Sequence, residues 1–262
     1  MKTQAVSEHI VNWMRDYCLR SGMNGFVVGV SGGVDSAVTS VLAARTGLEL
    51  HLAELPIHQH TSQVLRAQQH MEALASTYQH IKTHSIDLTT AFTSLMNVLP
   101  TGKDEALNEL CAANARSRLR MIALYNLAGQ HRCLVAGTGN KIEDFGVGFF
   151  TKYGDGGVDI SPIADLNKTQ VYALAEYLGV NEDILSAPPT DGLFGDSRTD
   201  EQQIGASYPE LEWAMEWAEC QSDESNLSPR QKEVWAIYKR MHIANRHKME
   251  PIPTCKIPAL LK

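Results

Sequence analysis

The chain has 262 residues, a formal net charge of −7 and a hydrophobic content of 44%. This length and apolar content allow one large α/β domain or two small ones around a sizeable core, and they exclude global disorder. The acidic balance argues against a general nucleic-acid binder and against a protein of anionic membranes. A local basic pocket for a small anion is still compatible with it.

The cysteines and the N-terminus bear on where the protein works. The five cysteines are odd in number and no two have CxxC spacing. We therefore expect a reducing compartment, with neither a disulfide framework nor a zinc site. The N-terminal stretch MKTQAVSEHIVNWM has no apolar signal core, and no segment has the length of a membrane span. We expect a cytoplasmic protein without a membrane partner.

Apolar periodicity predicts alternating helices and strands. The predicted helices lie at about 6–17, 35–46, 62–77 and 105–128. The predicted strands are short apolar or β-branched runs at 25–30, 48–55, 80–86 and 132–137. Because strands and helices alternate, we expect an α/β fold with a doubly wound parallel sheet flanked by helices. Ligands of such sheets bind beyond the carboxyl ends of the strands, so the loops after Val30 and Ala136 form the candidate site.

The second half of the chain carries helix-start signatures and a glycine-rich segment. The segments NKTQ (167–170), SYPE (207–210) and SPRQ (228–231) predict helix N-termini. Residues 151–161 are polar and glycine-rich, which predicts either a mobile active-site loop or a solvent loop. Three prolines predict that the tail from residue 249 onward is irregular.

The loop after the first predicted strand, in the segment FVVGVSGGVDSAV (26–38), has the features of a phosphate-binding loop. Gly32 and Gly33 allow the backbone to approach a ligand, and the N–H groups and dipole of the following helix favour an anion. Neither the Walker A lysine nor the GxGxxG pattern is present. Asp35 would repel a phosphate unless a divalent cation such as Mg²⁺ lies between them. The alternative is a first-turn acid that the helix dipole favours.

Six of these residues, SGGVDS (31–36), match the SGGxDS signature of the PP-loop ATP pyrophosphatases. Further segments resemble NAD synthetases, namely GTGNKIED, GFFTKYGDGGVDISPIADLNKTQVYALAEYLGV, PPTDGL, RTDEQQIGASYPELE and RHK. The resemblance covers roughly residues 26–248. It implies a PP-loop adenine nucleotide hydrolase-like fold, a homodimer, and a single NAD synthetase domain over 1–262 without a glutaminase domain.

The reaction that the resemblance implies is the amidation of nicotinic acid adenine dinucleotide (deamido-NAD) to NAD. ATP would adenylate the nicotinate carboxylate with release of pyrophosphate, and ammonia would then displace AMP. The resemblance implies Mg²⁺ as cofactor, ATP as co-substrate and no nucleic-acid partner, while a separate glutaminase subunit stays open as a source of ammonia. Two other hypotheses stay open: a PP-loop ligase with another substrate, such as a tRNA-modifying enzyme, and a non-catalytic nucleotide sensor.

The resemblance also implies which residues bind ATP and the metal. The expected ATP contacts are Gly29, Val30, Ser31, Gly32, Gly33, Val34, Asp35, Ser36, Thr138, Lys168 and Thr190. Asp35 and Glu143 are expected to be solvent-accessible metal ligands. Asp144 is the alternative to Glu143, because the segment from Glu143 to Gly148 is one residue longer than in some members. A bound phosphate would relieve the conflict between Lys168 and the dipole of the helix that it begins.

A last group of residues is implied for the second substrate and for catalysis. The expected contacts of deamido-NAD are Arg118, Lys152, Asp159, His247 and Lys248. Asp35, Thr138 and Asp155 are expected to take part in catalysis, Asp155 by orienting ammonium or accepting its proton. The alternatives are a helix cap for Thr138, a turn-former for Asp155, and a pair of cations at a helix C-terminus for His247 and Lys248.

Overall fold

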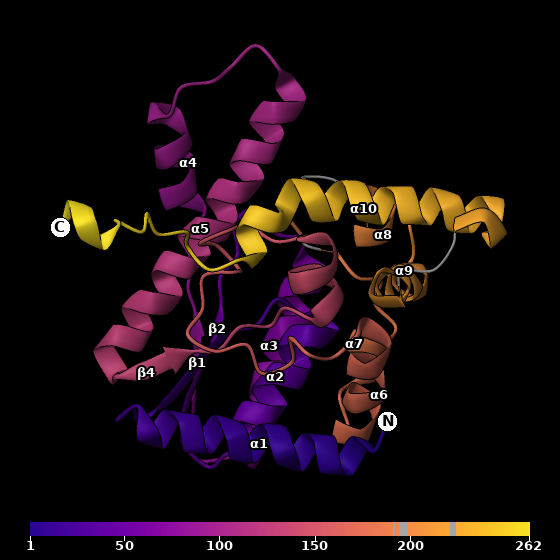
Figure 1. Ribbon diagram of the computed structural model, residues 1–262. Helices are drawn as coiled ribbons and strands as arrows, with labels where there is room; N and C mark the ends of the chain where they lie inside the picture. The colour runs from indigo at the N-terminus through magenta and orange to yellow at the C-terminus, as the bar shows by residue number, and fades with distance from the viewer. Residues whose placement is uncertain (191, 194–198, 221–223) are drawn as a thin grey trace.

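Four parallel strands form the sheet, in the spatial order β3-β2-β1-β4, and Figure 1 labels three of them. The strands are β1 (Gly25–Gly29), β2 (Glu49–Glu54), β3 (Ile81–Ser85) and β4 (Cys133–Val135). In this register Phe26 lies opposite Leu50 of β2 and Leu134 of β4. The chain builds the sheet outward from β1 to β3 and then returns to the other side of β1. The topological switch point therefore lies between β1 and β4.

The computed structural model describes residues 1–190, 192–193, 199–220 and 224–262. Its α-helices are α1 (Thr3–Arg20), α2 (Val34–Arg45), α3 (Thr61–Thr77), α4 (Thr89–Val98), α5 (Glu105–His131), α6 (Lys168–Leu178), α7 (Glu182–Leu185), α8 (Asp200–Ile204), α9 (Tyr208–Cys220) and α10 (Pro229–Met249). A π-helical segment, η1 (Ile142–Val147), and two 3-10 turns, η2 (Glu224–Asn226) and η3 (Ala259–Leu261), complete the elements. Within these ranges no helix is both long and apolar enough to cross a bilayer.

Alternate residues of the strands pack on opposite faces of the sheet. Phe26 and Val28 of β1 pack with α1, α2, α3, α6 and α7. Val27 points to the other face, where it packs with Leu127 and Ala128 of α5. Both faces of the sheet are therefore covered by helices, which explains why β1 is apolar throughout and does not alternate with polar residues.

A separate apolar cluster joins the C-terminal helices to η1. Leu211 of α9 and Val234 of α10 pack in one cluster with Ile142 and Val147 of η1. Figure 1 shows α9 and α10 on the side of the molecule away from β4. The segment after β4 is thus held by the C-terminal helices, and η1 keeps a fixed position next to the switch point.

The predicted fold class and all four predicted strands are confirmed, but the helices α4, α7 and α8 were not predicted. The sequence of α4, TTAFTSLMNV, is rich in threonine, and Phe92 is its one buried residue. Its apolar residues Phe92, Leu95 and Met96 do lie at helical spacing, but with 10 residues the helix is too short for this periodicity to be decisive. Together with the N-terminal half of α5, α4 projects from the body of the protein (Figure 1).

The predicted helix starts and the irregular tail are also confirmed. Asn167 and Ser228 form capping boxes at the starts of α6 and α10. At the start of α9 the N–H of Ser207 donates to the Glu210 carboxylate at 2.8 Å. The tail has no regular structure apart from the short η3 turn.

Candidate active site

A cleft opens at the switch point between β1 and β4, with a cavity volume of about 270 Å³. Its walls come from the loop after β1, the segment after β4, η1 and the start of α6. The lining includes all residues expected to contact ATP or the metal, namely Gly29, Val30, Ser31, Gly32, Gly33, Val34, Asp35, Ser36, Thr138, Glu143, Asp144, Lys168 and Thr190. The fold thus brings together segments that are far apart in the sequence, as expected for a doubly wound sheet.

The loop after β1 presents the open N-terminus of α2 to this cleft. Gly32 has a φ of +83°, and a Cβ there would lie 2.7 Å from the carbonyl oxygen of Gln63, so only glycine fits. Gly33 is the N-cap of α2, and no side chain caps the helix. Ser36 holds the turn, since its hydroxyl donates to the Gly33 carbonyl at 2.9 Å. The uncapped N–H groups and the helix dipole make this end of α2 a site for an anion.

Lys168 joins the two expected metal ligands. Its Nζ lies 2.6 Å from Oδ2 of Asp35 and 3.1 Å from Oε1 of Glu143. The lysine side chain is 3% exposed, whereas each acid side chain is 16% exposed and lines the cleft, so the acids are partly accessible and do not belong to the core. Burial disfavours the ammonium ion, but the charges of Asp35 and Glu143 outweigh it and raise the pKa of Lys168. These carboxylates compensate the cation at the start of α6.

Tyr208 and Asp200 also belong to the site, and neither was predicted from the sequence. The hydroxyl of Tyr208 lies within hydrogen-bonding distance of both Glu143 and Asp200, and it donates to one of them at a time. The ammonium group of Lys168 lies 4.6 Å from the centre of the Tyr208 ring, a cation–π contact. Tyr208 is the first residue of α9 and lies in the helix-start segment 207–210. Its contact with Glu143 could therefore not be recognised from the sequence.

Asp144 adds a third carboxylate to the same wall of the cleft. It precedes Phe145 in the π-helical turn η1, and both Glu143 and Asp144 line the cleft. Burial and the neighbouring charges of Glu143, Asp155 and Asp35 raise the pKa of Asp144 to about 8. Asp35 and Glu143 against one ammonium group leave this wall with excess negative charge, and Asp144, which is largely protonated near pH 7, would add to it on losing its proton. Hard oxygen ligands with uncompensated charge suit a divalent cation such as Mg²⁺.

Four of the five residues expected to contact deamido-NAD lie together. Arg118 Nε donates to the Lys152 carbonyl at 3.2 Å, and Lys152 Nζ donates to the His247 carbonyl at 2.6 Å. Lys248 Nζ donates to the Phe150 carbonyl at 2.6 Å. Within the described ranges neither lysine forms an ion pair with a carboxylate. We call these four residues, Arg118, Lys152, His247 and Lys248, the basic cluster.

The basic cluster adjoins the cleft through a smaller recess. Lys248 lines this recess together with Asp144, Phe150 and Asp155, and these three residues also line the cleft. His247 and Lys248 lie in the last turn of α10, so the alternative of cations at a helix C-terminus is confirmed for both. The two interpretations are compatible, because within the described ranges neither side chain pairs with a carboxylate.

Asp155 and Asp159 have different surroundings. Asp155 lines the cleft, and its Oδ1 accepts from Ser117 Oγ at 2.6 Å and from the Thr151 N–H at 2.9 Å. It therefore also shapes the glycine-rich turn, which forms a wall of the cleft. Asp159 does not line the cleft. Its carboxylate accepts from the Tyr125 hydroxyl at 3.0 Å and from the N–H of Val135, the last residue of β4, at 2.8 Å. Asp159 therefore connects the end of β4 to α5.

We predict that Lys168→Met destabilises the ligand-free protein strongly. Removing the ammonium group leaves two largely buried carboxylates without their cation, which costs about 3–5 kcal/mol. The matched control is Lys141→Met, since Lys141 lies 3.5 Å from an Asp165 side chain that is 99% exposed. The control should lose less than about 1 kcal/mol. Urea unfolding in metal-free buffer measures both, and equal losses would contradict the proposed importance of the Lys168 ion pairs.

Comparison with known proteins places this arrangement in a family. A family model described as NAD synthase matches residues 6–252. The NH(3)-dependent NAD(+) synthetase of Mycoplasma genitalium is 39% identical over 208 residues, which cover 78% of this chain and 80% of the relative. The enzyme of the same name from Syntrophomonas wolfei is 36% identical over 265 residues and 100% of both chains. The solved structure of NMN synthetase from Francisella tularensis superposes with a TM-score of 0.83 at 31% identity, over 98% of this chain and 100% of that one. This chain therefore belongs to the NAD synthase family.

Proposed function

We propose that this protein is an ATP-dependent ligase that amidates deamido-NAD with ammonia to form NAD. The observation that carries the proposal is the full-length similarity to a relative named NH(3)-dependent NAD(+) synthetase. The cleft supports it, because an anion site at the start of α2 faces a wall of carboxylates. An anion site opposite a group of carboxylates suits a nucleoside triphosphate bound together with a divalent cation.

In the proposed reaction a carboxylate oxygen of the nicotinate ring attacks the α-phosphorus of ATP, and pyrophosphate leaves. Ammonia then attacks the carbonyl carbon of the acyl adenylate. The bond between this carbon and the phosphate oxygen breaks, AMP leaves with its electron pair, and the nitrogen loses a proton to give the amide. The N-terminus of α2 is proposed to hold the leaving phosphates, with Lys168 adding charge. Asp155 lines the cleft and is proposed to orient ammonium or accept its proton.

We propose Asp35 and Glu143 as the ligands of Mg²⁺, with Asp144 as an alternative or additional ligand. When bound, this ion would supply positive charge to the phosphate oxygens. The ammonium group of Lys168 between Asp35 and Glu143 supports the assignment, since it marks where the protein attracts a cation. The basic cluster is proposed to bind the phosphates of deamido-NAD, with Arg118 able to form a two-pronged contact.

A second candidate function differs in the size of the substrate. The structural relative from Francisella tularensis is named NMN synthetase and has a TM-score of 0.83. The same cleft in this chain could then amidate nicotinic acid mononucleotide, which lacks the adenylate half of deamido-NAD. Both reactions use the same acyl-adenylate chemistry, so the two candidates differ in binding and not in mechanism.

We predict that the purified protein with ATP and Mg²⁺ forms NAD from deamido-NAD and ammonium, with one AMP per NAD. Glutamine free of ammonium should give no NAD, and AMP should not form without the nicotinate substrate. The ratio of kcat/KM for deamido-NAD and nicotinic acid mononucleotide decides between the two candidates. Amide formation from neither compound would refute both.

We predict that Asp35→Asn and Glu143→Gln each lower kcat by about 10²-fold or more, since each removes charge from the metal site. Both variants should keep the wild-type circular dichroism spectrum. Asp165→Asn is the matched control, because its carboxylate is 99% exposed and lies outside the cleft. Wild-type rates in either cleft variant would show that the metal assignment is wrong.

We also propose a homodimer in the cytoplasm. The projecting pair of helices exposes Val98 by 78% and Leu107 by 56%, an apolar surface that a second copy of this chain would cover. We predict that Val98→Ser with Leu107→Ser shifts the sedimentation coefficient from dimer to monomer, whereas a wild-type monomer would exclude the proposal.

All five cysteines are free thiols, which suits a reducing compartment, and cell fractionation tests this location.

A further inference from the structure

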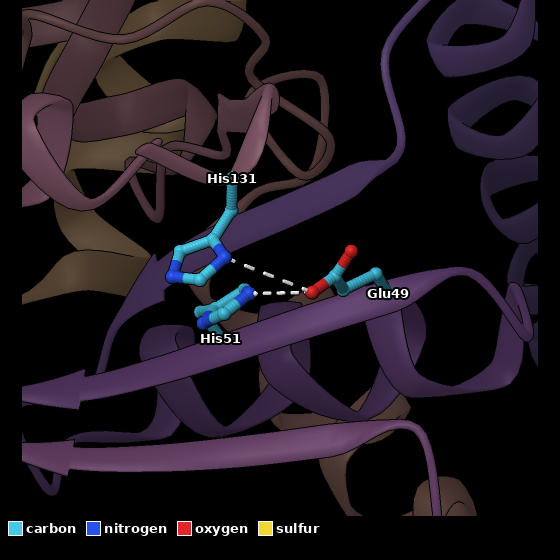
Figure 2. Close-up of side chains that lie close together, drawn as sticks. All are labelled: Glu49, His51 and His131. Carbon is cyan, nitrogen blue, oxygen red and sulfur yellow. Dashed lines mark hydrogen bonds and ion pairs between the residues drawn. The ribbon is translucent and has the colours of Figure 1, made fainter. Parts of the chain in front are cut away.

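A second cluster of chemically active side chains lies at the opposite end of the sheet from the cleft. Glu49 and His51 lie at the start of β2, and His131 is the last residue of α5. Figure 2 shows the three side chains pointing toward one another between strand and helix. None of the three lines the cleft, which is built at the carboxyl ends of the strands. The proposed reaction therefore does not use this cluster.

The distances within the cluster match those between ligands of one metal ion. His51 Nε2 lies 3.0 Å from Glu49 Oε1, and His131 Nδ1 lies 3.9 Å from the same oxygen. One ligand atom from each residue falls within 4.8 Å of the other two. Nitrogen and oxygen ligands at about 2.0–2.2 Å from a tetrahedral zinc ion are themselves about 3.3 Å apart. The His51 and His131 rings stack with centroids 3.9 Å apart and planes inclined by 29°, so the His131 ring would have to rotate for both nitrogens to point at one ion.

We propose that Glu49, His51 and His131 bind a divalent transition-metal ion of the zinc class. Two imidazoles and one carboxylate are a known ligand set for zinc, and imidazole favours such an ion over Mg²⁺. This site was not predicted from the sequence, because the cysteine spacing argued against zinc and the histidines lie 80 positions apart.

His84 is positioned to orient His51. Its Nε2 lies 2.9 Å from His51 Nδ1, on the side of the ring away from Glu49. A histidine that binds a metal through one nitrogen usually donates the N–H of the other to such a partner. His51 is fully buried, so the surrounding packing holds its ring in this position.

The ammonium group of Lys82 already contacts the Glu49 carboxylate and would have to move away when a metal ion binds. Lys82 Nζ lies 2.8 Å from Glu49 Oε1. The Lys82 side chain is 58% exposed, so its ammonium group is free to turn toward water when an ion binds. An exposed ion pair of this kind contributes little to stability, so it competes weakly with a metal.

The role that follows is structural. The ion would connect β2 to the C-terminus of α5, two elements that are separated by α3, β3 and α4 in the sequence. The helix α5 also supplies Ser117 and Arg120 to the cleft. Fixing its end would therefore hold these residues in place without any contact between the ion and a substrate.

The test counts zinc ions bound by the full-length protein after EDTA treatment and removal of the chelator. Zn²⁺ is titrated against a chromophoric competing chelator, and thermal unfolding is followed with and without Zn²⁺. We expect one tight equivalent in the wild type and a higher midpoint of unfolding with Zn²⁺. His131→Gln and Glu49→Gln should lose both effects, and His84→Gln should weaken zinc binding about 10- to 100-fold.

Two controls separate this site from the cleft and from unspecific binding. Asp35→Asn should keep the tight equivalent, as should His9→Gln, whose imidazole is exposed on α1. Co²⁺ added to the wild type should give the absorption bands of a tetrahedral site with nitrogen ligands, a result that does not depend on any variant folding. The proposal is overturned if the wild type binds no tight equivalent, if the Co²⁺ bands are absent, or if Asp35→Asn removes the equivalent.

Discussion

The contact of Lys168 with Asp35 and Glu143 is the interaction on which the cleft depends. It joins the first turns of α6 and α2 to the π-helical turn η1, three segments that share no hydrogen-bonded sheet edge. A lysine at a helix N-terminus opposes the helix dipole, and its burial adds a cost of desolvation. Both costs are offset only while the two carboxylates stay in place. The position of each acid is therefore coupled to the packing of α6.

The topology explains why these groups meet at all. Since the strand order reverses between β1 and β4, the loops after the two strands diverge and leave room at the sheet edge. One wall of that space is the uncapped N-terminus of α2, which attracts anions, and the other is the carboxylate pair with Asp144. A site that attracts both signs of charge suits a phosphate chain together with a cation.

The sequence predicted the fold and most of the cleft lining, because short apolar runs, glycines and capping residues act locally. Asp35 lies in a recognisable loop, and Asn167 marks the start of α6. The partners of Lys168 could not be predicted, since they depend on how α6 packs against a residue 133 positions earlier. The contacts of Tyr208 and His131 could not be predicted for the same reason. In the sequence each residue is only part of a helix end, and its partner, Asp200 or Glu49, is brought close only by folding.

The proposed metal and the cleft are linked through α5, and geometry limits what that link can be. Arg118 precedes His131 by 13 residues in this 27-residue helix, a distance on the order of 20 Å along its axis. That exceeds the Debye length of about 8 Å at physiological salt, so the charge of the ion itself has little effect at the cleft. A rigid helix, by contrast, transmits position over its whole length. Because His131 is followed directly by the left-handed Arg132, which ends the helix, a ligand at this residue fixes both the axial position and the rotation of α5. The effect on substrate binding would then come from the placement of Arg118 and Arg120, and not from electrostatics.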